Sequence, residues 1–342
     1  MKTPIQTLST LAGVVLLTGS TLAQTTTSSS QAGTSAPTAG RSRLEFQIEQ
    51  LLDSARFSYK AIDPGEYTPE TSSSLMERIL AVSHFQLEPG DIQEPGHYLL
   101  QSSMDPSAML HVDAVGRSVI FNKGVATIRA LADTPGLPGQ QVAPQVAQEL
   151  LGQLGMLPGD PGQVFVQHVG GLGMGVHDEA GTTRTFEKLR TVRFGRKLDG
   201  LSVEGRGSRI QVQLGSEGAL WGLVHRWNEV LPIQLAPADR LDVGQLTQMF
   251  WERVSQMKLL RYDGVKVDRV ELVLYDDGEG VIEPVLRCQF RTKDRVRTSG
   301  TGEIREVVNP GDFYLPVLRE TQLDLPYVKD ITAAGIAQPQ ED

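Results

Sequence analysis

Residues 208–220 read SRIQVQLGSEGAL and carry the clearest strand pattern in the chain. Ile210, Val212 and Leu214 alternate with arginine and glutamine, so we expect one face of this strand to be buried and the other to be solvated. The glycines in GSEG suit a hairpin turn, after which residues 219–227 return as a second strand. The stretch therefore predicts an antiparallel sheet that covers a core with one face only.

A helix is predicted before this sheet, over residues 144–154. Pro144 suits the first helical turn and Gly155 suits the end, with an apolar stripe at helical spacing between them. Two further strands, 164–169 and 185–194, are predicted between the helix and the hairpin. The segment is therefore a helix followed by a run of strands.

The same order recurs on both sides of this segment. Asp242 and Gln245 have the spacing of a capping box at the start of a helix. That helix is followed by predicted strands at 265–275, 281–291 and 312–318, and a weaker copy of the order occupies 74–122. The prediction is an α+β fold of tandem units, in which one helix packs on one face of each antiparallel meander.

The central unit has a family resemblance. Residues 194–205 read FGRKLDGLSVEG, and the strand 208–214 and the hairpin 217–220 follow. This order resembles the PepSY and thermolysin-propeptide families, which have an aromatic-led strand, a glycine-containing turn and an alternating strand before a hairpin. Ser202 and Glu217 stand where those families have proline and aspartate.

The resemblance implies cystatin-like α+β modules, which occur as protease propeptides and as extracytoplasmic domains. It also implies a non-catalytic, partner-binding or inhibitory role, and no zinc-protease signature follows in the sequence. On residue chemistry alone, a generic β-hairpin with glycines at positions 200 and 205 could contain the same residues without belonging to these families.

The amino terminus predicts export. Lys2 is followed by the apolar run Leu8–Leu17, and Thr21–Ala23 offers small residues for cleavage after Ala23. The run is shorter than the roughly 20 residues that span a bilayer, which disfavours the alternative of an uncleaved anchor. We expect a secreted or periplasmic protein that has no transmembrane insertion after cleavage.

The predicted organisation has six parts. They are a signal peptide (1–23), a disordered Thr/Ser-rich leader (24–43), an N-terminal α+β unit (44–138), a central PepSY-like unit (139–235), a C-terminal α+β unit (236–329) and a loose tail (330–342).

The charge balance disfavours nucleic acid as a partner. The formal net charge is −9, and loss of Lys2 with the signal would make it −10. The densest basic run, Arg184–Lys197, alternates with apolar residues, so it is interpreted as the solvated face of a sheet, with an anion-binding face as the alternative.

Function is the least determined property of the sequence. We expect a non-catalytic binding module for a protein partner, such as a peptidase or an envelope component, with no cofactor and no metal. The oligomeric state stays open. The predicted binding residues are Arg193, Arg196, Asp199, Gly200, Leu201 and Trp227.

Two alternatives remain. One is a secreted hydrolase whose site is assembled from distant residues, and the other is a structural envelope protein. The catalytic candidates for the hydrolase are His168, His177, Asp178 and His225. Their spacing matches no zinc motif, and the glycine-rich stretch 170–175 lacks the following helix that phosphate binding needs.

Overall fold

The computed structural model of the chain describes residues 42–62, 68–89, 95–177, 183–259, 266–297 and 304–326. These residues form two compact units, each built from segments that are discontinuous in the sequence. The first unit lies within Gly65–Gly195 and Arg209–Trp227, and the second lies within Thr27–Pro64, Arg196–Ser208 and Asn228–Asp342.

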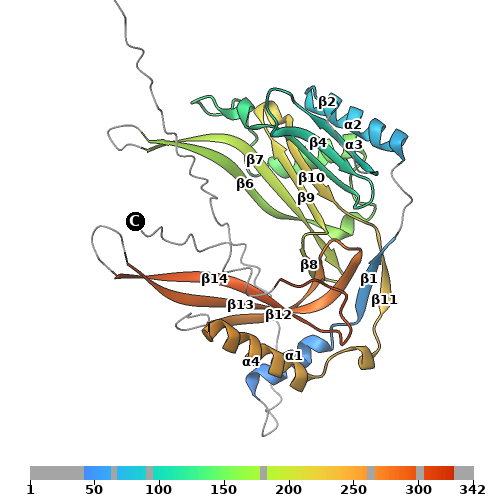
Figure 1. Cartoon of the computed structure of the whole chain (residues 1–342), viewed down its shortest axis with the longest axis vertical. Helices are drawn as coiled ribbons and strands as arrows, with labels where there is room; N and C mark the ends of the chain where they lie inside the picture. Colours follow the sequence, from blue (N-terminus) through green and yellow to red (C-terminus); the bar gives the residue numbers. More distant parts are fainter. Residues whose placement is uncertain are drawn as a thin grey trace, which may run out of the picture. The chain divides into compact units, whose positions relative to one another are not determined.

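The first unit contains an antiparallel sheet (Figure 1). Its strands are β2 (Glu88–Pro89), β3 (His97–Gln101), β4 (Ala108–Asp113), β5 (Ser118–Lys123), β6 (Val164–His177), the first part of β7 (Thr183–Leu198), β9 (Arg209–Leu214) and β10 (Leu220–Arg226). The spatial order is β7-β9-β10-β5-β4-β3-β2, and β6 pairs with β7.

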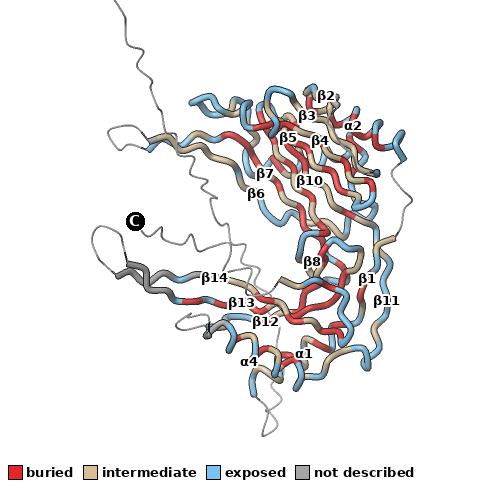
Figure 2. The backbone as a smooth tube through the Cα atoms, in the orientation of Figure 1, coloured by how far each residue is buried: buried red, intermediate tan, exposed pale blue. Residues whose placement is uncertain are grey.

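Two helices cover one face of this sheet, α2 (Pro69–Ser83) and α3 (Ala143–Leu154). The hydroxyl of Thr68 caps the start of α2, and Gly155 ends α3 in the left-handed conformation, with φ of 67°. The alternating apolar residues of the strands pack against these helices and form one core, shown by the buried stretches in Figure 2.

The second unit contains a mixed sheet. Its strands are β1 (Phe57–Ala61), β8 (Leu201–Gly205), β11 (Val230–Gln234), β12 (Lys266–Asp276), β13 (Val281–Arg297), β14 (Ile304–Pro316) and the last residues of β7. The order is β11-β1-β13-β12-β8-β7, with β14 paired to β13. The sheet is mixed because β12 runs parallel to β8, whereas its other neighbour β13 is antiparallel.

Helices α1 (Arg43–Leu52) and α4 (Val243–Leu259) pack on each other and on this second sheet. The predicted capping box at the start of α4 is confirmed, since the Gln245 backbone N–H donates to the Asp242 carboxylate at 2.8 Å. The core of this unit includes Phe250, Phe313 and the buried Cys288.

The predicted fold of tandem helix-plus-meander units is wrong. Strand β7 takes part in both units, and hydrogen-bond ladders link the strands into one 14-stranded sheet that dominates the described chain. The helices pair as α1 with α4 and α2 with α3, instead of one helix for each meander.

The physical reason for this error is that periodicity identifies strands but does not identify their partners. Strand β1 pairs with β11, and its residue Tyr59 lies opposite Pro232 although more than half of the chain separates them. No local pattern reports such a pairing. Residues 53–56 follow the end of α1 and lead into β1.

Four short 3₁₀ helices complete the described structure, at Val125–Ile128, Pro161–Gln163, Ser216–Gly218 and Pro237–Asp239. No helix within the described ranges has the length and apolar character needed to cross a bilayer.

Candidate binding site on the first sheet

The sheet of the first unit has a face without helices. On β9, Ile210, Val212 and Leu214 enter the core with α2 and α3, so the intervening Arg209 and Gln211 lie on the opposite face. We call that side the open face. The strand register assigns to it His97, Leu99, His111, Asp113, Ser118, Ile120, Arg193, Arg209, Gln211, Val224 and Arg226.

Three arginines gather at one end of the open face. Arg209 on β9 lies directly opposite Arg226 on β10. Arg193 on β7 lies opposite Gln211, whose side-chain oxygen accepts a hydrogen bond from Arg209 at 2.6 Å. Directly opposed like charges destabilise a sheet, so this arginine cluster is not explained by sheet stability.

The closeness of the three positive charges affects the protonation of the arginine cluster. Burial, followed by the positive charges of Arg193 and Arg226, lowers the pKa of Arg209. Within the described residues, no carboxylate forms an ion pair with any of the three arginines. The buried Nε atoms of Arg209 and Arg226 have no hydrogen-bond partner there, as is also the case for Arg287 Nε. An anion bound beside the three arginines would relieve the repulsion between their charges.

The middle of the open face is aliphatic. Val224 on β10 lies opposite Gln211 on one side and opposite Ile120 on the other side. Both side chains are partly exposed, as is Leu99 further along the same row. The open face is therefore cationic at Arg209 and Arg226 on β9 and β10, and it becomes apolar at Val224 and Ile120 on β10 and β5.

The far end of the open face carries two histidines and a carboxylate. The His97 and His111 rings stack with centroids 5.4 Å apart, and their Nδ1 and Nε2 atoms lie 3.2 Å apart. Asp113 Oδ1 lies 3.8 Å from His97 Nδ1 and accepts hydrogen bonds from the backbone of Val115 and Gly116. Burial, followed by the charge of His97, lowers the pKa of His111.

The predicted binding residues are divided between the two units. Arg193 lies on the open face, and Trp227 is buried in the core of the first unit. In the second unit, Arg196 is fully buried and donates to the Asn228 carbonyl at 2.7 Å. These two buried side chains therefore stabilise the fold and are not available to a partner.

The remaining predicted binding residues form the turn between β7 and β8. Asp199 and Gly200 both have positive φ, 48° and 80°, as a two-residue hairpin requires. The Asp199 carboxylate accepts a hydrogen bond from the Tyr59 hydroxyl, and burial raises the pKa of Tyr59. Leu201 is partly buried against the core. The turn is thus held by packing and by the bond to β1.

The structure does not bring the catalytic candidates together. His168 is an exposed residue of β6, whereas His225 is a partly buried residue of β10, with β7 and β9 between these two strands. His225 Nε2 contacts the Met156 carbonyl at 3.0 Å, and burial lowers its pKa to about 4. His177 ends β6, and Asp178 lies outside the described residues.

Neither a phosphate-binding loop nor a metal site is found among the described residues. The glycine-rich stretch 170–175 belongs to strand β6 and does not form a loop. Across the described ranges, no group of three His, Cys, Asp or Glu side chains is placed to hold a metal ion.

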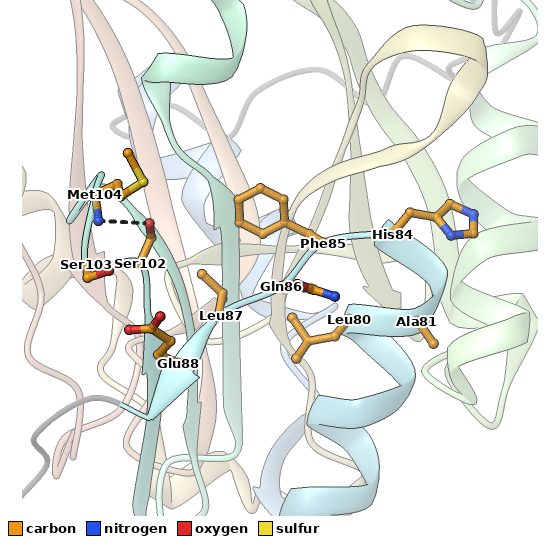
Figure 3. Close-up of a pocket in the computed structure, with 10 residues that line it drawn as sticks. All are labelled: Leu80, Ala81, His84, Phe85, Gln86, Leu87, Glu88, Ser102, Ser103 and Met104. Carbon is orange, nitrogen blue, oxygen red and sulfur yellow. Dashed lines mark hydrogen bonds between the residues drawn. The ribbon is translucent and has the colours of Figure 1, made fainter.

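A surface depression of about 840 Å³ lies between the end of α2 and the turn after β3 (Figure 3). Phe85 and Leu87 line it, while the His84 ring points away from Phe85. Ser102 in the opposite wall accepts a hydrogen bond from the Met104 backbone at 3.3 Å. These polar groups do not converge on one point, so the hollow is a weaker site than the open face.

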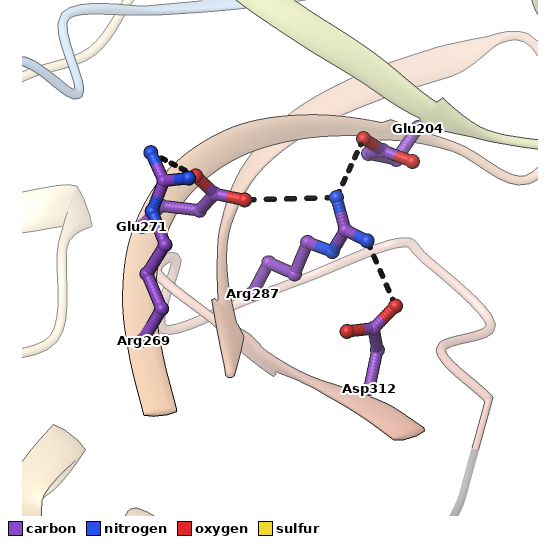
Figure 4. Close-up of polar contacts among 5 residues, drawn as sticks. All are labelled: Glu204, Arg269, Glu271, Arg287 and Asp312. Atoms are coloured by element: carbon purple, nitrogen blue, oxygen red, sulfur yellow. Dashed lines mark hydrogen bonds and ion pairs between the residues drawn. The ribbon is translucent and has the colours of Figure 1, made fainter. Parts of the chain in front are cut away.

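The second unit has an arginine of the opposite kind (Figure 4). The Arg287 guanidinium lies 3.1 Å from Glu204, 3.6 Å from Glu271 and 2.9 Å from Asp312. Arg269 pairs with Glu271 at 2.9 Å. Burial opposes the charge of Arg287, but the hydrogen bond to Asp312 and the charges of its neighbours raise its pKa. We call this group the carboxylate cage.

Sequence reasoning found Arg193 but missed Arg209 and Arg226. A signal was present for Arg209, which occupies a polar position of the alternating strand β9, whereas β10 does not alternate and gave no such signal for Arg226. What the alternation could not show is that these positions become neighbours across β9 and β10.

Comparisons with known proteins add no function. No protein-family model matches the chain, and no curated protein matches it. Among solved structures, an uncharacterized protein from Eubacterium rectale ATCC 33656 matches with 12% sequence identity and a TM-score of 0.40. That match covers 78% of this chain and 86% of the other.

Proposed function

We propose that the chain is an exported, non-catalytic binding protein whose open face captures an anionic region of a protein partner. The observation that carries this proposal is the arginine cluster, in which three neighbouring guanidinium groups have no carboxylate partner among the described residues. Export rests on the signal-like residues 1–23, and the resemblance of residues 194–220 to propeptide-type modules favours the same non-catalytic role.

The chain's overall charge strengthens the case. With a formal net charge of −9, the protein repels anions at long range, so a local cationic patch is needed to bind one. The same chain surrounds Arg287 with three carboxylates, which shows that acidic residues are available for pairing. Among the described residues no carboxylate pairs with the arginine cluster, which leaves that cluster available to an external anion.

The test is a comparative capture experiment. The mature protein, the triple variant Arg193→Gln/Arg209→Gln/Arg226→Gln and a control variant Arg43→Gln/Arg129→Gln/Arg184→Gln are immobilised separately. The three control arginines are exposed and lie outside the arginine cluster, so both variants lose the same charge. Extract of the source organism is passed over each, and retained proteins are quantified by mass spectrometry.

We expect a saturable partner that binds the native protein and the control but is lost from the cluster variant. Partners retained equally by all three proteins would contradict the proposed function. Circular dichroism of each variant checks that the fold is intact.

A further inference from the structure

The chemistry of the open face also indicates what kind of anion it takes. Resting on the proposed function, we infer that the bound region is an extended acidic peptide that lies across the strands. Its carboxylates would occupy the arginine cluster, and its aliphatic side chains would cover Val224 and Ile120.

Carboxylates fit the arginine cluster by geometry. A guanidinium presents planar paired donors that match a carboxylate, and two guanidinium groups directly opposite each other offer two such forks side by side. Binding would offset the repulsion among the arginines, which adds to burial in lowering the pKa of Arg209. A segment with two or three consecutive acidic residues would therefore neutralise the cluster.

The aliphatic middle of the open face argues against other polyanions. The register of the described strands places no Trp, Tyr or Phe next to Val224 and Ile120, and the ring of Phe165 on β6 lies beside Gly195, at the β7 edge of the face. Proteins that bind single-stranded nucleic acid stack its bases on such rings, and aromatic rings also give amphipathic ligands a flat apolar surface. Aliphatic side chains suit Val, Ile or Ala of a peptide instead. The open face thus favours a peptide over a nucleic acid or an anionic sugar.

The far end of the open face gives the peptide a direction. Neighbouring strands are about 4.8 Å apart, so β9 and β4 are separated by roughly 14 Å. An extended peptide covers that distance with about four residues at ~3.3 Å each. Asp113 at the far end would repel a carboxylate there, so the acidic residues lie at the arginine end and neutral residues lie near His111.

Three labelled hexapeptides test the inference by fluorescence anisotropy with the mature protein. The first is Glu-Glu-Glu-Val-Ser-Val, and the second replaces both valines by serine. The third replaces the glutamates by glutamine. A hexameric oligogalacturonate and a DNA hexamer supply the same kind of charge on other backbones.

We expect the first peptide to bind best and the second to bind about tenfold more weakly, equivalent to about 1.4 kcal/mol. The third peptide should not bind. The double variant Arg209→Gln/Arg226→Gln should lose at least about tenfold in affinity for the first peptide. The variant Arg209→Lys/Arg226→Lys should be intermediate, because lysine keeps the charge but loses the fork.

Equal binding of the first two peptides, or tighter binding of the sugar or the DNA, would overturn the peptide inference. If the double variant Arg209→Gln/Arg226→Gln also loses binding of that sugar, DNA or peptide, the arginine cluster is still an anion-binding site and the proposed function stands. Binding of no probe at all overturns the inference, and the capture experiment decides the proposed function separately. Self-association that the double variant abolishes in light scattering would make a second copy of the chain the occupant and would also overturn it.

Discussion

The arginine cluster of the first unit and the carboxylate cage of the second unit use the same side chain in opposite ways. Arg287 is surrounded by Glu204, Glu271 and Asp312, and its pKa is raised despite burial. Arg209 faces Arg226 and lies near Arg193, and burial, followed by the charges of these two arginines, lowers its pKa. Both groups lie on strand faces that are only partly shielded from solvent.

The difference separates a structural role from a binding role. A charge that is already paired contributes to folding and gains little from a ligand. A group of like charges costs stability until an anion arrives, so its presence in a folded protein indicates a use outside the fold. The comparison therefore assigns the carboxylate cage to stability and the arginine cluster to binding.

The largest effect is expected from breaking the carboxylate cage. Arg287→Met leaves three carboxylates close together without their cation, so we expect a loss of about 2–4 kcal/mol in the free energy of unfolding. Denaturant titration measures it. The control Arg269→Met, which removes only one exposed partner of Glu271, should cost less than about 1 kcal/mol. Equal losses in both variants would contradict the cage.

The next effect is a pH dependence of stability that arises from His225, on the face of the first sheet that α2 and α3 cover. His225 has a folded pKa of about 4, below its ordinary 6.5, so the unfolded chain binds a proton first as the pH falls. Stability from this group is complete above about pH 6.5 and is lost toward pH 4. We expect a loss of about 2–3 kcal/mol between pH 7 and pH 4.5 that His225→Gln removes. An unchanged pH dependence in that variant would show that other groups cause it.

On the open face, substitution of the arginines is expected to change the free energy of unfolding only slightly, and to raise it if it changes it at all. Arg209→Gln/Arg226→Gln removes directly opposed like charges, so stability should stay within about 1 kcal/mol of the native value or rise. Denaturant titration of the double variant gives the comparison with Arg287→Met. A loss as large as that of Arg287→Met would mean that the cluster supports the fold.

The smallest effect is that of salt. Repulsion between partly exposed guanidinium groups is screened when the ionic strength rises, because the Debye length falls from about 10 Å at 0.1 M to about 3 Å at 1 M. The difference in unfolding free energy between the native protein and the double variant should therefore shrink by a few tenths of a kcal/mol. A difference that grows with salt would exclude repulsion as its cause.

Individual elements were predictable from the sequence because their signals are local. The Asp242 capping box, the Pro144-to-Gly155 helix and the alternation over 209–214 all lie within a few residues. The arrangement of these elements was not predictable, because Tyr59 meets Pro232 and Leu274 meets Val203 only through pairing between distant strands.

For the candidate site, too, local sequence identified some residues, and pairing between distant strands was needed for the others. Arg193 was identified from its basic run, but Arg196 in the same run is fully buried, since a strand turns neighbouring residues to different environments. Arg209 and Arg226 are recognised as part of a site only when β9 and β10 are paired, because the pairing places them opposite each other. A charge pattern in one strand therefore does not reveal a site that several strands share.

The most direct test of the central claim is the reactivity of each arginine toward phenylglyoxal, followed by mass spectrometry with and without the acidic peptide. We expect Arg193, Arg209 and Arg226 to be modified several times faster than the caged Arg287, and we expect the peptide to protect only these three. Equal reactivity of Arg287 and the cluster, or no protection by the peptide, would contradict the distinction between an open binding face and a closed structural ion pair.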